Sequence, residues 1–550
     1  MGNKLRLIPL GGLGEIGKNM MLFEYDGSSL LVDAGLMFPE NDMLGIDYII
    51  PDFRYVLEHK DMLRGILITH GHEDHTGAIK HVMQQLDAPV YATPLTRGLL
   101  EVKLRDARLL DKVQLHTVNA GDTVHIGPFQ VELFHVCHSI PDGVGLGITT
   151  PAGLIVHSGD FKFDHTPVDG WPTDYAKLAE FSGRGVLALL SDSTNADKAG
   201  WTPSEAVIDP AFDQVFREAP GRILVATFAS LISRIQQVLN AAYRHGRKMA
   251  LVGTSMVENA KMAQKLGYLN VPDGLIISMD EALRLSPAKV VIMTTGTQGE
   301  PSSILGRLSE ARNRQFDLIE NDTIVLSSHP IPGNEEMVHR TINKLLQRGA
   351  RVIYDPIAPV HVSGHASAEE MKLLIHLVKP RNFIPVHGEL RHLTQHAAIA
   401  REVGIPEENI QVVENGTVLE FEDGLLRVGE RIPGGYVYVD GSGVGDIGPS
   451  VMREREALAQ DGFVIINLRL DQSGRLVGQP EIISRGFVFV RDADELFTAA
   501  QEQITQAVAR ANGSTPSAQA VKDKVTQVLA DFFYAELKRR PMIFALVNDA

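Results

Sequence analysis

Six consecutive residues, His70-Gly71-His72-Glu73-Asp74-His75, hold three imidazoles and two carboxylates. They follow an apolar stretch, residues 65–69, that predicts a strand, and they precede a stretch that predicts a helix beginning near Thr76. Such groups are costly to crowd into a tight loop on their own, whereas divalent cations convert them into ligands. The alternative is a solvated polar loop that happens to be rich in histidine, and the density of ligand-type side chains disfavours it. The run therefore predicts a metal-binding loop.

Three further ligand-type residues stand where predicted strands end: His138 after residues 131–136, Asp160 after 153–159 and His387 after 382–386. Loops at strand ends are where α/β layers place their functional groups. Each residue taken alone is better explained as a capped or surface side chain, but with the six-residue run they complete two ligand sets. One ion would take His70, His72, His138 and Asp160, and a second would take Asp74, His75, His387 and the same Asp160. Two ions that share a carboxylate can stabilise the attacking and leaving oxygens of a hydrolysis.

These motifs resemble those of the metallo-β-lactamase superfamily, in which Asp33 would join the seven residues above. Further motifs resemble its nucleic-acid-processing β-CASP branch: Asp192 in residues 191–195, His365 in 361–365 and His387 in 385–389. Residues 295–301, 331–335 and 484–487 narrow the resemblance to bacterial ribonuclease J, over essentially the whole chain. Two positions depart from that family, where Leu231 replaces a polar Asn and Thr254 replaces an Arg.

The resemblance implies an α/β chain: a metallo-β-lactamase αββα sandwich with an inserted β-CASP parallel-sheet domain and a small C-terminal α/β domain. It implies a two-metal ribonuclease that acts as a 5′-to-3′ exonuclease favouring 5′-monophosphate RNA, admits endonuclease cleavage, and serves RNA maturation and decay in the cytoplasm. The implied cofactors are two divalent ions per subunit, Zn²⁺ and/or Mn²⁺, because His and Asp ligands suit both. The implied partners are the RNA substrate, other copies of the chain in a homodimer or homotetramer, and other RNA-decay proteins.

The resemblance also implies roles for individual residues. Asp74 or Asp160 would orient the attacking water, and His365 is the candidate for protonating the departing 3′ oxygen, helped by Asp192 and another group of the site. The expected RNA and phosphate contacts are Ser230, Arg234, His361, Ser363, Gly364 and His365.

The spacing of Ser367 and Glu370 is that of a capping box, so a helix should begin just after Ser367. Free backbone N–H groups at that helix end would attract a phosphate held near Ser363 and Gly364. The alternative is that Gly364 only makes a turn and that His365 caps the chain locally.

Three other functions compete with an RNA hydrolase: a DNA nuclease of the same branch, a small-molecule metallo-hydrolase, and an inactive scaffold. A small substrate needs no second lobe over the metals, whereas a polymer needs a groove. The seven ligand positions are intact, which argues against a scaffold. In the family, the third β-CASP motif is usually His in RNA enzymes and Val in DNA enzymes, and this chain has His387. RNA is favoured.

The alternation of apolar runs predicts five segments. Residues 1–200 begin the sandwich, 201–360 form the insertion, 361–425 complete the sandwich, 426–460 form a glycine-rich linker and 461–550 form the C-terminal domain. In the insertion, strand-like runs at 223–226, 249–252, 290–293 and 323–326, with amphipathic stretches at 231–245 and 335–348, predict a parallel sheet flanked by helices. The C-terminal domain should have strands near 463–470 and 486–490 and helices near 493–511 and 517–538.

Composition bears on the substrate and on the cellular compartment of the chain. A net charge of −16 is unusual for an enzyme that binds phosphates. Bound metals and basic groups lining a channel would offset it; the candidates are Arg234, Arg244, Arg247, Lys248 and residues 538–540, although a surface charge is the simpler interpretation of each. No apolar run approaches the ~20 residues that span a bilayer, and no leader peptide is apparent. The single cysteine, Cys137, suits a reducing cytosol and is interpreted as a small core residue.

One motif predicts a different function. Gly12-Leu13-Gly14-Glu15-Ile16-Gly17, with Asp33 about twenty residues on, has the spacing of a dinucleotide-binding fingerprint. That fingerprint must open a helix, but the following residues 19–25 are strand-like and end at Asp26-Gly27, a hairpin turn signal. The sequence therefore disfavours nucleotide-cofactor binding at this loop.

Overall fold

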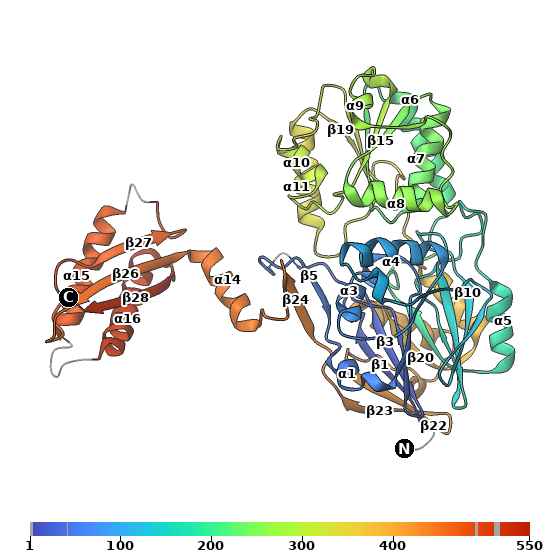
Figure 1. Cartoon of the computed structure of the whole chain (residues 1–550), viewed down its shortest axis with the longest axis horizontal. Helices are drawn as coiled ribbons and strands as arrows, with labels where there is room; N and C mark the ends of the chain where they lie inside the picture. The colour runs from blue at the N-terminus through green and yellow to red at the C-terminus, as the bar shows by residue number, and fades with distance from the viewer. Residues whose placement is uncertain (1–3, 41, 490–492, 511–516, 550) are drawn as a thin grey trace. The chain divides into compact units, whose positions relative to one another are not determined.

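The computed structural model describes residues 4–40, 42–489, 493–510 and 517–549. It contains two compact units (Figure 1). The larger comprises Met1–Glu40 and Tyr48–Val437, and the smaller comprises Asn41–Asp47 and Tyr438–Ala550. Within the described residues, no helix is long and apolar enough to cross a membrane.

Two facing sheets form the lower part of the larger unit. The strands of the first are, in order, β23 (Leu425–Arg431), β22 (Thr417–Glu422), β1 (Leu5–Gly11), β3 (Met20–Tyr25), β4 (Ser28–Val32), β6 (Leu63–Leu67), β7 (Val90–Ala92) and β8 (Leu115–Thr117). Those of the second are β20 (Pro380–Val386), β13 (Val186–Asp192), β12 (Gly153–His157), β11 (Val144–Thr150), β10 (Phe129–His135) and β9 (Thr123–Ile126). Apolar side chains of both sheets, including Phe23, Leu30, Leu146 and Ile155, meet in one core.

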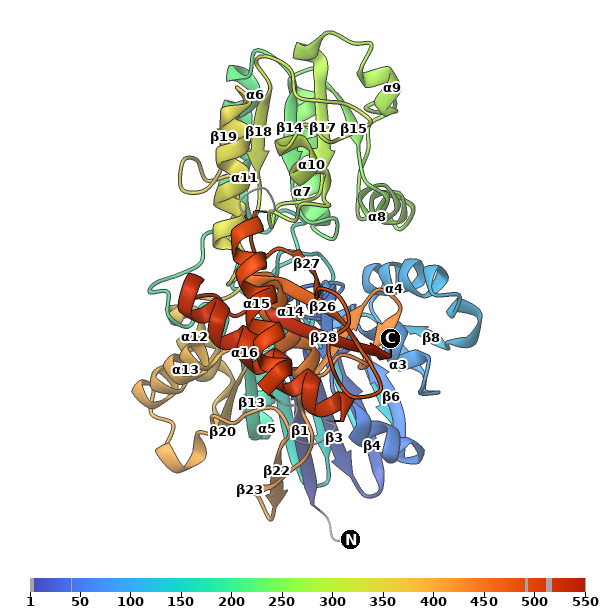
Figure 2. The ribbon, with the colours of Figure 1, turned by 90° about the vertical axis from the view of Figure 1, so that its left-hand side faces the viewer.

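Helices cover the outer faces of these sheets (Figures 1 and 2). They are α1 (Arg54–Glu58), α2 (Glu73–Thr76), α3 (Ile79–Met83), α4 (Pro94–Asp106), α5 (Tyr175–Arg184), α12 (Ala368–Val378) and α13 (Leu390–Glu402). Phe181 of α5, Leu374 of α12 and Ile399 of α13 share a second core with Val156 and Leu189 of the second sheet. The predicted αββα sandwich is confirmed.

The inserted lobe is a six-stranded, wholly parallel sheet (Figure 2). Its order is β16 (Ile276–Ile277), β15 (Lys248–Leu251), β17 (Val290–Thr294), β14 (Ile223–Ala226), β18 (Thr323–Leu326) and β19 (Arg351–Ile353). One face packs on α6 (Ile208–Glu218), α7 (Ile232–Arg244) and α8 (Thr254–Lys265). The other packs on α9 (Met279–Ala282), α10 (Ile304–Ser309) and α11 (Glu335–Gln347). The predicted parallel sheet is confirmed; the short β16 and β19 were not predicted.

The chain leaves the sandwich after β13 and returns to it at α12, followed by β20, which pairs in parallel with β13. Asn195 on the way out and Ser367 on the way back form a parallel bridge. The two crossings between lobes therefore lie beside each other, and His387 follows directly after the returning strand. The domain boundaries set out above stay predictions.

The predicted linker at 426–460 is not irregular. It contains most of β23, then β24 (Tyr436–Asp440), β25 (Gly443–Val444) and most of α14 (Pro449–Asp461). Its glycines mark the turns between these elements, such as Gly441 at φ +57°, and do not prevent pairing.

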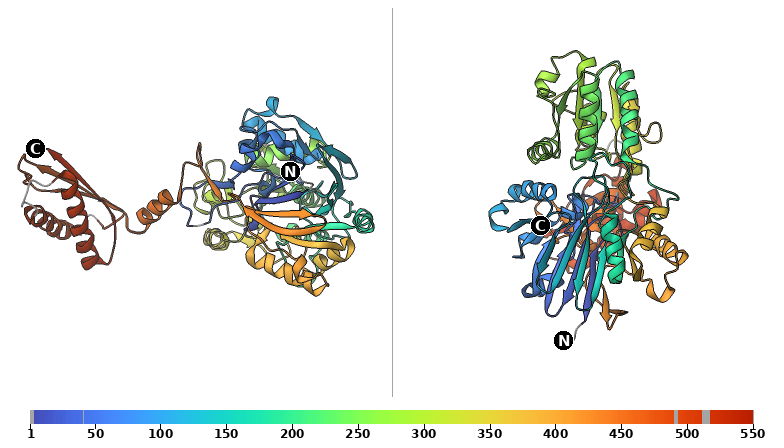
Figure 3. Two further views of the ribbon diagram at one scale, coloured as in Figure 1. Left: turned by 90° about the horizontal axis from the view of Figure 1, so that it is seen from below. Right: turned by 90° about the vertical axis from the view of Figure 1, so that its right-hand side faces the viewer.

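The smaller unit contains a three-stranded sheet, β27 (Glu481–Arg485), β26 (Phe463–Leu470) and β28 (Met542–Asp549), with α15 (Asp494–Arg510) and α16 (Ala518–Leu537) along one face (Figure 3). The predicted β26 and α16 agree closely with the structure. The strand expected near 486–490 lies instead at 481–485, and β28 was not predicted. Residue 490 and residue 511, at the ends of an expected strand and helix, lie outside the described residues.

Candidate metal centre

The six-residue run follows shortly after β6, and its last three residues lie in a helix. α2 begins at Glu73, three residues before the predicted start, so Asp74 and His75 lie in its first turn. The carbonyl oxygens of Glu73, Asp74 and His75 accept hydrogen bonds from the amides of Leu36 (3.0 Å), Asn19 (2.9 Å) and Ala34 (2.8 Å). These distant backbone bonds hold the short helix in place and orient the two ligand-type side chains.

Close approach of the backbone behind this turn requires a glycine. A Cβ added to Gly35 would lie 1.6 Å from the carbonyl oxygen of Asp74. Beside it, Asp33 takes a left-handed conformation, φ +63°, and its carboxylate accepts from the amide and hydroxyl of Thr69 and lies 2.7 Å from Nδ1 of His75. That contact fixes the ring of His75 and leaves its Nε2 facing inward.

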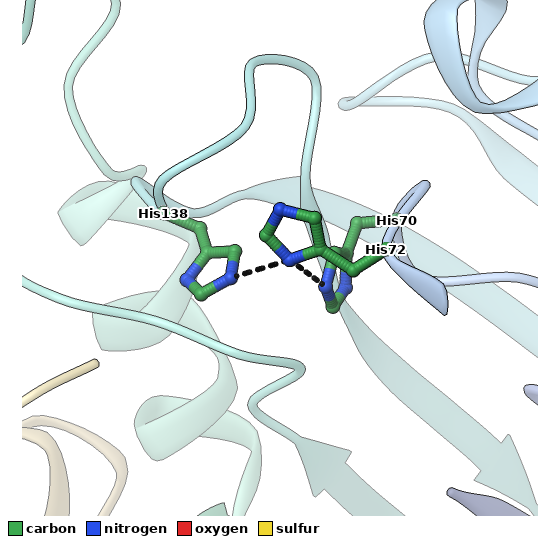
Figure 4. A group of neighbouring side chains, drawn as sticks. All are labelled: His70, His72 and His138. Atoms are coloured by element: carbon green, nitrogen blue, oxygen red, sulfur yellow. Dashed lines mark hydrogen bonds between the residues drawn. The ribbon is translucent and has the colours of Figure 1, made fainter. Parts of the chain in front are cut away.

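Three histidines form the first donor group, His70, His72 and His138, with ring nitrogens within 4.8 Å of one another (Figure 4). Nε2 of His70 and Nε2 of His138 each lie 3.1 Å from Nδ1 of His72. The other nitrogen of His138 lies 2.7 Å from the carbonyl oxygen of Gly364. Burial lowers the pKa of His72 to about 4, and burial with neighbouring imidazoles holds the pKa of His70 and His138 well below the ordinary value. Three neutral imidazoles whose nitrogens converge provide lone pairs for one cation.

The second donor group is richer in carboxylates: Asp74, His75, Asp160 and His387. Nε2 of His75 lies 3.2 Å from Asp160, and the two ring nitrogens of His387 lie 3.0 Å from Asp160 and 3.3 Å from Asp74. Burial disfavours the charged form of His387, but Asp160 and Asp74 outweigh it and raise its pKa to about 10. His387 itself takes a left-handed conformation, φ +52°, directly after β20.

Asp160 lies between the two groups. Its Oδ2 is 3.7 Å from His70, 3.8 Å from His138 and 3.2 Å from His75. Among the described residues, this buried oxygen and Nε2 of His387 have no hydrogen-bond partner. Buried polar atoms are normally paired, so converging unpaired donors of metal-ligand type fit divalent cations. The structure thus brings all seven predicted ligands together. Asp160 belongs to the second group and lies near His70 and His138 of the first without joining their group, and metal binding by the seven stays a prediction.

Two predicted catalytic residues border the same centre. Nδ1 of His365 lies 2.8 Å from Oδ2 of Asp192, and the same nitrogen lies 3.9 Å from Asp160. Burial opposes the charged imidazole, but the Asp192 carboxylate prevails and raises the pKa of His365. Asp160, Asp192, His365 and His387 form a third, overlapping group of candidate ligands, which the sequence did not predict.

The helix expected after Ser367 is present, and Glu370 accepts a 2.9 Å hydrogen bond from the amide of Ser367. The prediction of free N–H groups at its end is wrong. The amides of Ala368 and Glu369 donate to the carbonyl oxygens of Lys198 (2.9 Å) and Gly200 (3.1 Å). Backbone carbonyls therefore occupy the place where an anion was expected.

Arg234 was predicted to contact RNA, and the structure contradicts this. Its side chain is fully buried on α7, where it donates to Glu205 (2.9 Å), Gln237 (2.9 Å), the Val360 carbonyl (2.9 Å) and the Ser327 hydroxyl. Every guanidinium nitrogen has a protein partner, so none faces a groove. Arg247 is likewise buried against the carbonyl oxygens of Phe216, Ala219 and Gly221.

These contacts define the lobe junction, formed by Lys162, Glu205, Arg234, Ser327 and Val360. Lys162 of the sandwich lies 3.6 Å from Glu205, and Glu205 pairs with Arg234 of the insertion. Ser327 donates to Val360, whose segment leads to His365. The junction joins both chain crossings through buried charges. No local sequence pattern indicates it, because its members are far apart in the chain.

The remaining predicted RNA contacts occupy different settings. Ser363 accepts a 2.8 Å hydrogen bond from Asn195, while Gly364 packs against His138. His361 lies beside Arg234 and stacks edge-on with His329. Ser230 is half-buried just before α7. The two departures from the family pattern are a buried Leu231 before α7 and an exposed Thr254 at the start of α8.

Family models match four successive segments. They are the metallo-beta-lactamase superfamily over residues 13–201, the ribonuclease J beta-CASP domain over 220–345, a Zn-dependent metallo-hydrolase RNA specificity domain over 349–412 and the ribonuclease J C-terminal domain over 450–550. Ribonuclease J2 of Bacillus subtilis (strain 168) is 42% identical over 99% of this chain and 98% of its own length. The chain belongs to the ribonuclease J family.

As a ribonuclease J family member, the chain is a metal-dependent ribonuclease, as predicted. Ribonuclease J of Synechocystis sp. is also 42% identical, over 99% of this chain and 86% of its own length. A crystal structure of a protein of unknown function from Enterococcus faecalis V583 superposes with a TM-score of 0.53 at 16% identity, covering 77% of this chain and 100% of that one. That likeness concerns the fold alone.

Proposed function

We propose that the chain hydrolyses RNA with two divalent ions, one in each donor group and both sharing Asp160. The observation that carries this is the unpaired, buried Oδ2 of Asp160 between two convergent ligand sets. When bound, such ions lower the pKa of water and polarise a phosphodiester. The test is elemental analysis of the chain purified without chelator, followed by removal and return of Zn²⁺ or Mn²⁺. Two ions per chain, with activity that follows their return, are expected; fewer ions would overturn the two-metal assignment.

The residues around the ions would orient and move protons. Asp74 and Asp160 accept hydrogen bonds and so can orient an attacking water. His365, held by Asp192 at 2.8 Å, would protonate the departing 3′ oxygen. An imidazole whose partner carboxylate favours the charged form is suited to donate a proton at neutral pH.

We propose that the activity is 5′-to-3′ exonucleolytic, favours 5′-monophosphate ends and admits internal cleavage. Ser363 and Gly364 support this, because they lie beside His365 and His138, where a terminal phosphate would be close to the scissile bond. RNA carrying a 5′-monophosphate should be degraded to mononucleotides, and RNA carrying a bulkier 5′-triphosphate should be degraded slowly. Equal rates on both ends with only internal fragments would leave an endonuclease.

We further propose that the chain self-associates as a dimer or tetramer through its C-terminal domain. The sheet face opposite α15 and α16 is apolar and open, with Ile483, Phe544 and Leu546 each 45–49% exposed. Sedimentation of the full chain should give a dimer or larger species, and Phe544→Asp should shift it toward monomer. A monomeric wild-type chain contradicts the proposal. We also propose that the chain works in the cytoplasm, whose reducing conditions suit its single cysteine, and that other RNA-decay proteins are its partners there.

A further inference from the structure

The loop from Gly11 to Asn19, here called the glycine loop, includes the motif that resembles a dinucleotide fingerprint. No helix follows it: β3 pairs with β4 as an antiparallel hairpin, as predicted. The loop is nevertheless buried, with Glu15, Lys18 and Asn19 each less than 10% exposed. A buried loop with two charged side chains needs a structural reason, because charges are costly to remove from water.

Asn19 gives the first part of that reason. Its backbone amide and its side-chain Nδ2 both donate to the carbonyl oxygen of Asp74, at 2.9 and 3.1 Å. The same Nδ2 lies 3.1 Å from Nε2 of His75, and the Asn19 carbonyl accepts from Gly35 at 2.9 Å. Asn19 therefore holds the backbone of Asp74 and contacts the ring of His75, the two residues that α2 contributes to the second donor group.

The loop also holds the third ligand segment. β2 (Leu13–Gly14) pairs in parallel with β21 (Gly388–Glu389), and the amide of Gly388 donates to the Gly12 carbonyl at 3.2 Å. Gly388 follows His387 directly. Among the described residues, the hydrogen bonds of the loop thus reach both sides of the second donor group and none of the first group's three histidines.

A buried ion pair makes the loop rigid. Nζ of Lys18 lies 2.7 Å from Oε1 of Glu15, which also accepts from the amide of Gly12 (3.1 Å) and from Asn415 (2.8 Å). The chain closes tightly on itself, since a Cβ on Gly11 would lie 1.8 Å from the carbonyl oxygen of Lys18. Nζ of Lys18 has no hydrogen-bond partner among the described residues, so it depends on its charge pairing with Glu15, and neither charge can shift without losing that pairing.

We infer that Asn19 and the Glu15–Lys18 pair are positioning residues for the second donor group alone. They fix α2 and the residues after His387 in the relative placement that a cation at Asp74, His75, Asp160 and His387 requires. This inference rests on the proposed two-metal function. Residues that orient metal ligands typically change metal affinity by about 10- to 100-fold when replaced.

The test measures metal content and affinity of the full chain, by dialysis against Zn²⁺ with a competing chelator. Asn19→Ala should keep one ion at wild-type affinity and bind the other about 10- to 100-fold more weakly. Lys18→Met should act in the same direction. Asn382→Ala is a matched control. Among the described residues, the side chain of this buried asparagine donates to the Leu187 carbonyl of β13 and contacts no member of either donor group, so the variant should keep both ions.

Adding Asn19→Ala to each of two ligand variants shows which donor group holds the weakened ion. His72→Ala disrupts the first donor group and keeps the second intact, so adding Asn19→Ala should weaken the binding of the remaining ion. Asp74→Ala disrupts the second donor group and keeps the first intact, so adding Asn19→Ala should not change the affinity for the remaining ion. Equal weakening in both backgrounds, or two tightly held ions in Asn19→Ala, overturns the positioning role while the metal centre stands. A wild-type chain that binds no Zn²⁺ overturns the centre itself. If Asn19→Ala does not fold, Lys18→Met decides by the same measurements.

Discussion

The metal centre and the lobe junction are both buried clusters of charged residues drawn from distant segments, yet their internal bonding differs. In the junction, every nitrogen of the Arg234 guanidinium has a protein partner. In the centre, Oδ2 of Asp160 and Nε2 of His387 are buried without one. Oε1 of Glu205 in the junction also lacks a hydrogen bond, but it faces the ammonium of Lys162 at 3.6 Å. A cluster whose opposite charges are paired stabilises the fold, whereas a cluster in which ligand-type atoms of several residues converge without hydrogen bonds suits a cation.

The largest effect is expected from emptying the second donor group. Asp74→Ala with His75→Ala removes two ligands from α2, so RNA turnover should fall by at least about 10³-fold, as removal of a whole catalytic unit does. Bound metal should fall, while the chain stays folded, since the pair lies outside the main cores. Circular dichroism, metal analysis and RNA degradation measure the three quantities. Normal RNA degradation by the double variant would falsify the assignment of the centre.

Replacing His365 separates chemistry from metal binding. His365→Ala should retain both ions, bind RNA nearly as well and turn over about 10²–10⁴-fold more slowly, the usual cost of a lost general acid. A substrate with sulfur as the leaving atom needs little protonation and should largely restore the rate. Lack of rescue with full metal content would reduce His365 to a phosphate contact. Loss of metal would instead make it a ligand of the third group.

Arg234 should behave as a structural residue. Arg234→Met breaks the 2.9 Å ion pair with buried Glu205 and leaves only the more distant Lys162 opposite that carboxylate, which costs up to about 3–5 kcal/mol of unfolding free energy. Arg244→Met on the same helix removes an exposed pair with Asp213 and should cost less than about 1 kcal/mol. Denaturant unfolding compares the two. The salt dependence of RNA binding should be unchanged in Arg234→Met; a slope smaller by about one would mean that Arg234 contacts a phosphate after all.

The smallest effect is expected at Ser363. Its hydroxyl oxygen accepts from Asn195 and from the amide of His365, so only its own proton is left to donate to a phosphate. Ser363→Ala removes this one hydrogen bond, worth about 1 kcal/mol. The preference for 5′-monophosphate RNA should therefore fall about fivefold, and internal cleavage should be unchanged. Competition between the two RNA ends measures this. An unaltered preference would move the phosphate site elsewhere.

The same comparison explains what the sequence could predict. His70 to His75 and the strand-end residues are recognisable because ligand chemistry is written in residue type and local spacing. Whether Arg234 is free or paired depends on Glu205, 29 residues away, and on Val360. The helix after Ser367 was predicted from its capping box, but the carbonyls that occupy its end come from Lys198 and Gly200. Partner satisfaction is a long-range property, so it could not be predicted.

The placement of the insertion between neighbouring strands has a consequence for biosynthesis. The whole second lobe separates β13 from β20, and His387 follows β20. Chains are made from the N-terminus, and domains fold as they emerge. A nascent chain therefore carries His70, His72 and His138 long before it can complete the carboxylate-rich set. If the seven residues bind two ions as we propose, a chain that ends before His387 lacks one ligand of the second donor group and would lack the two-ion activity.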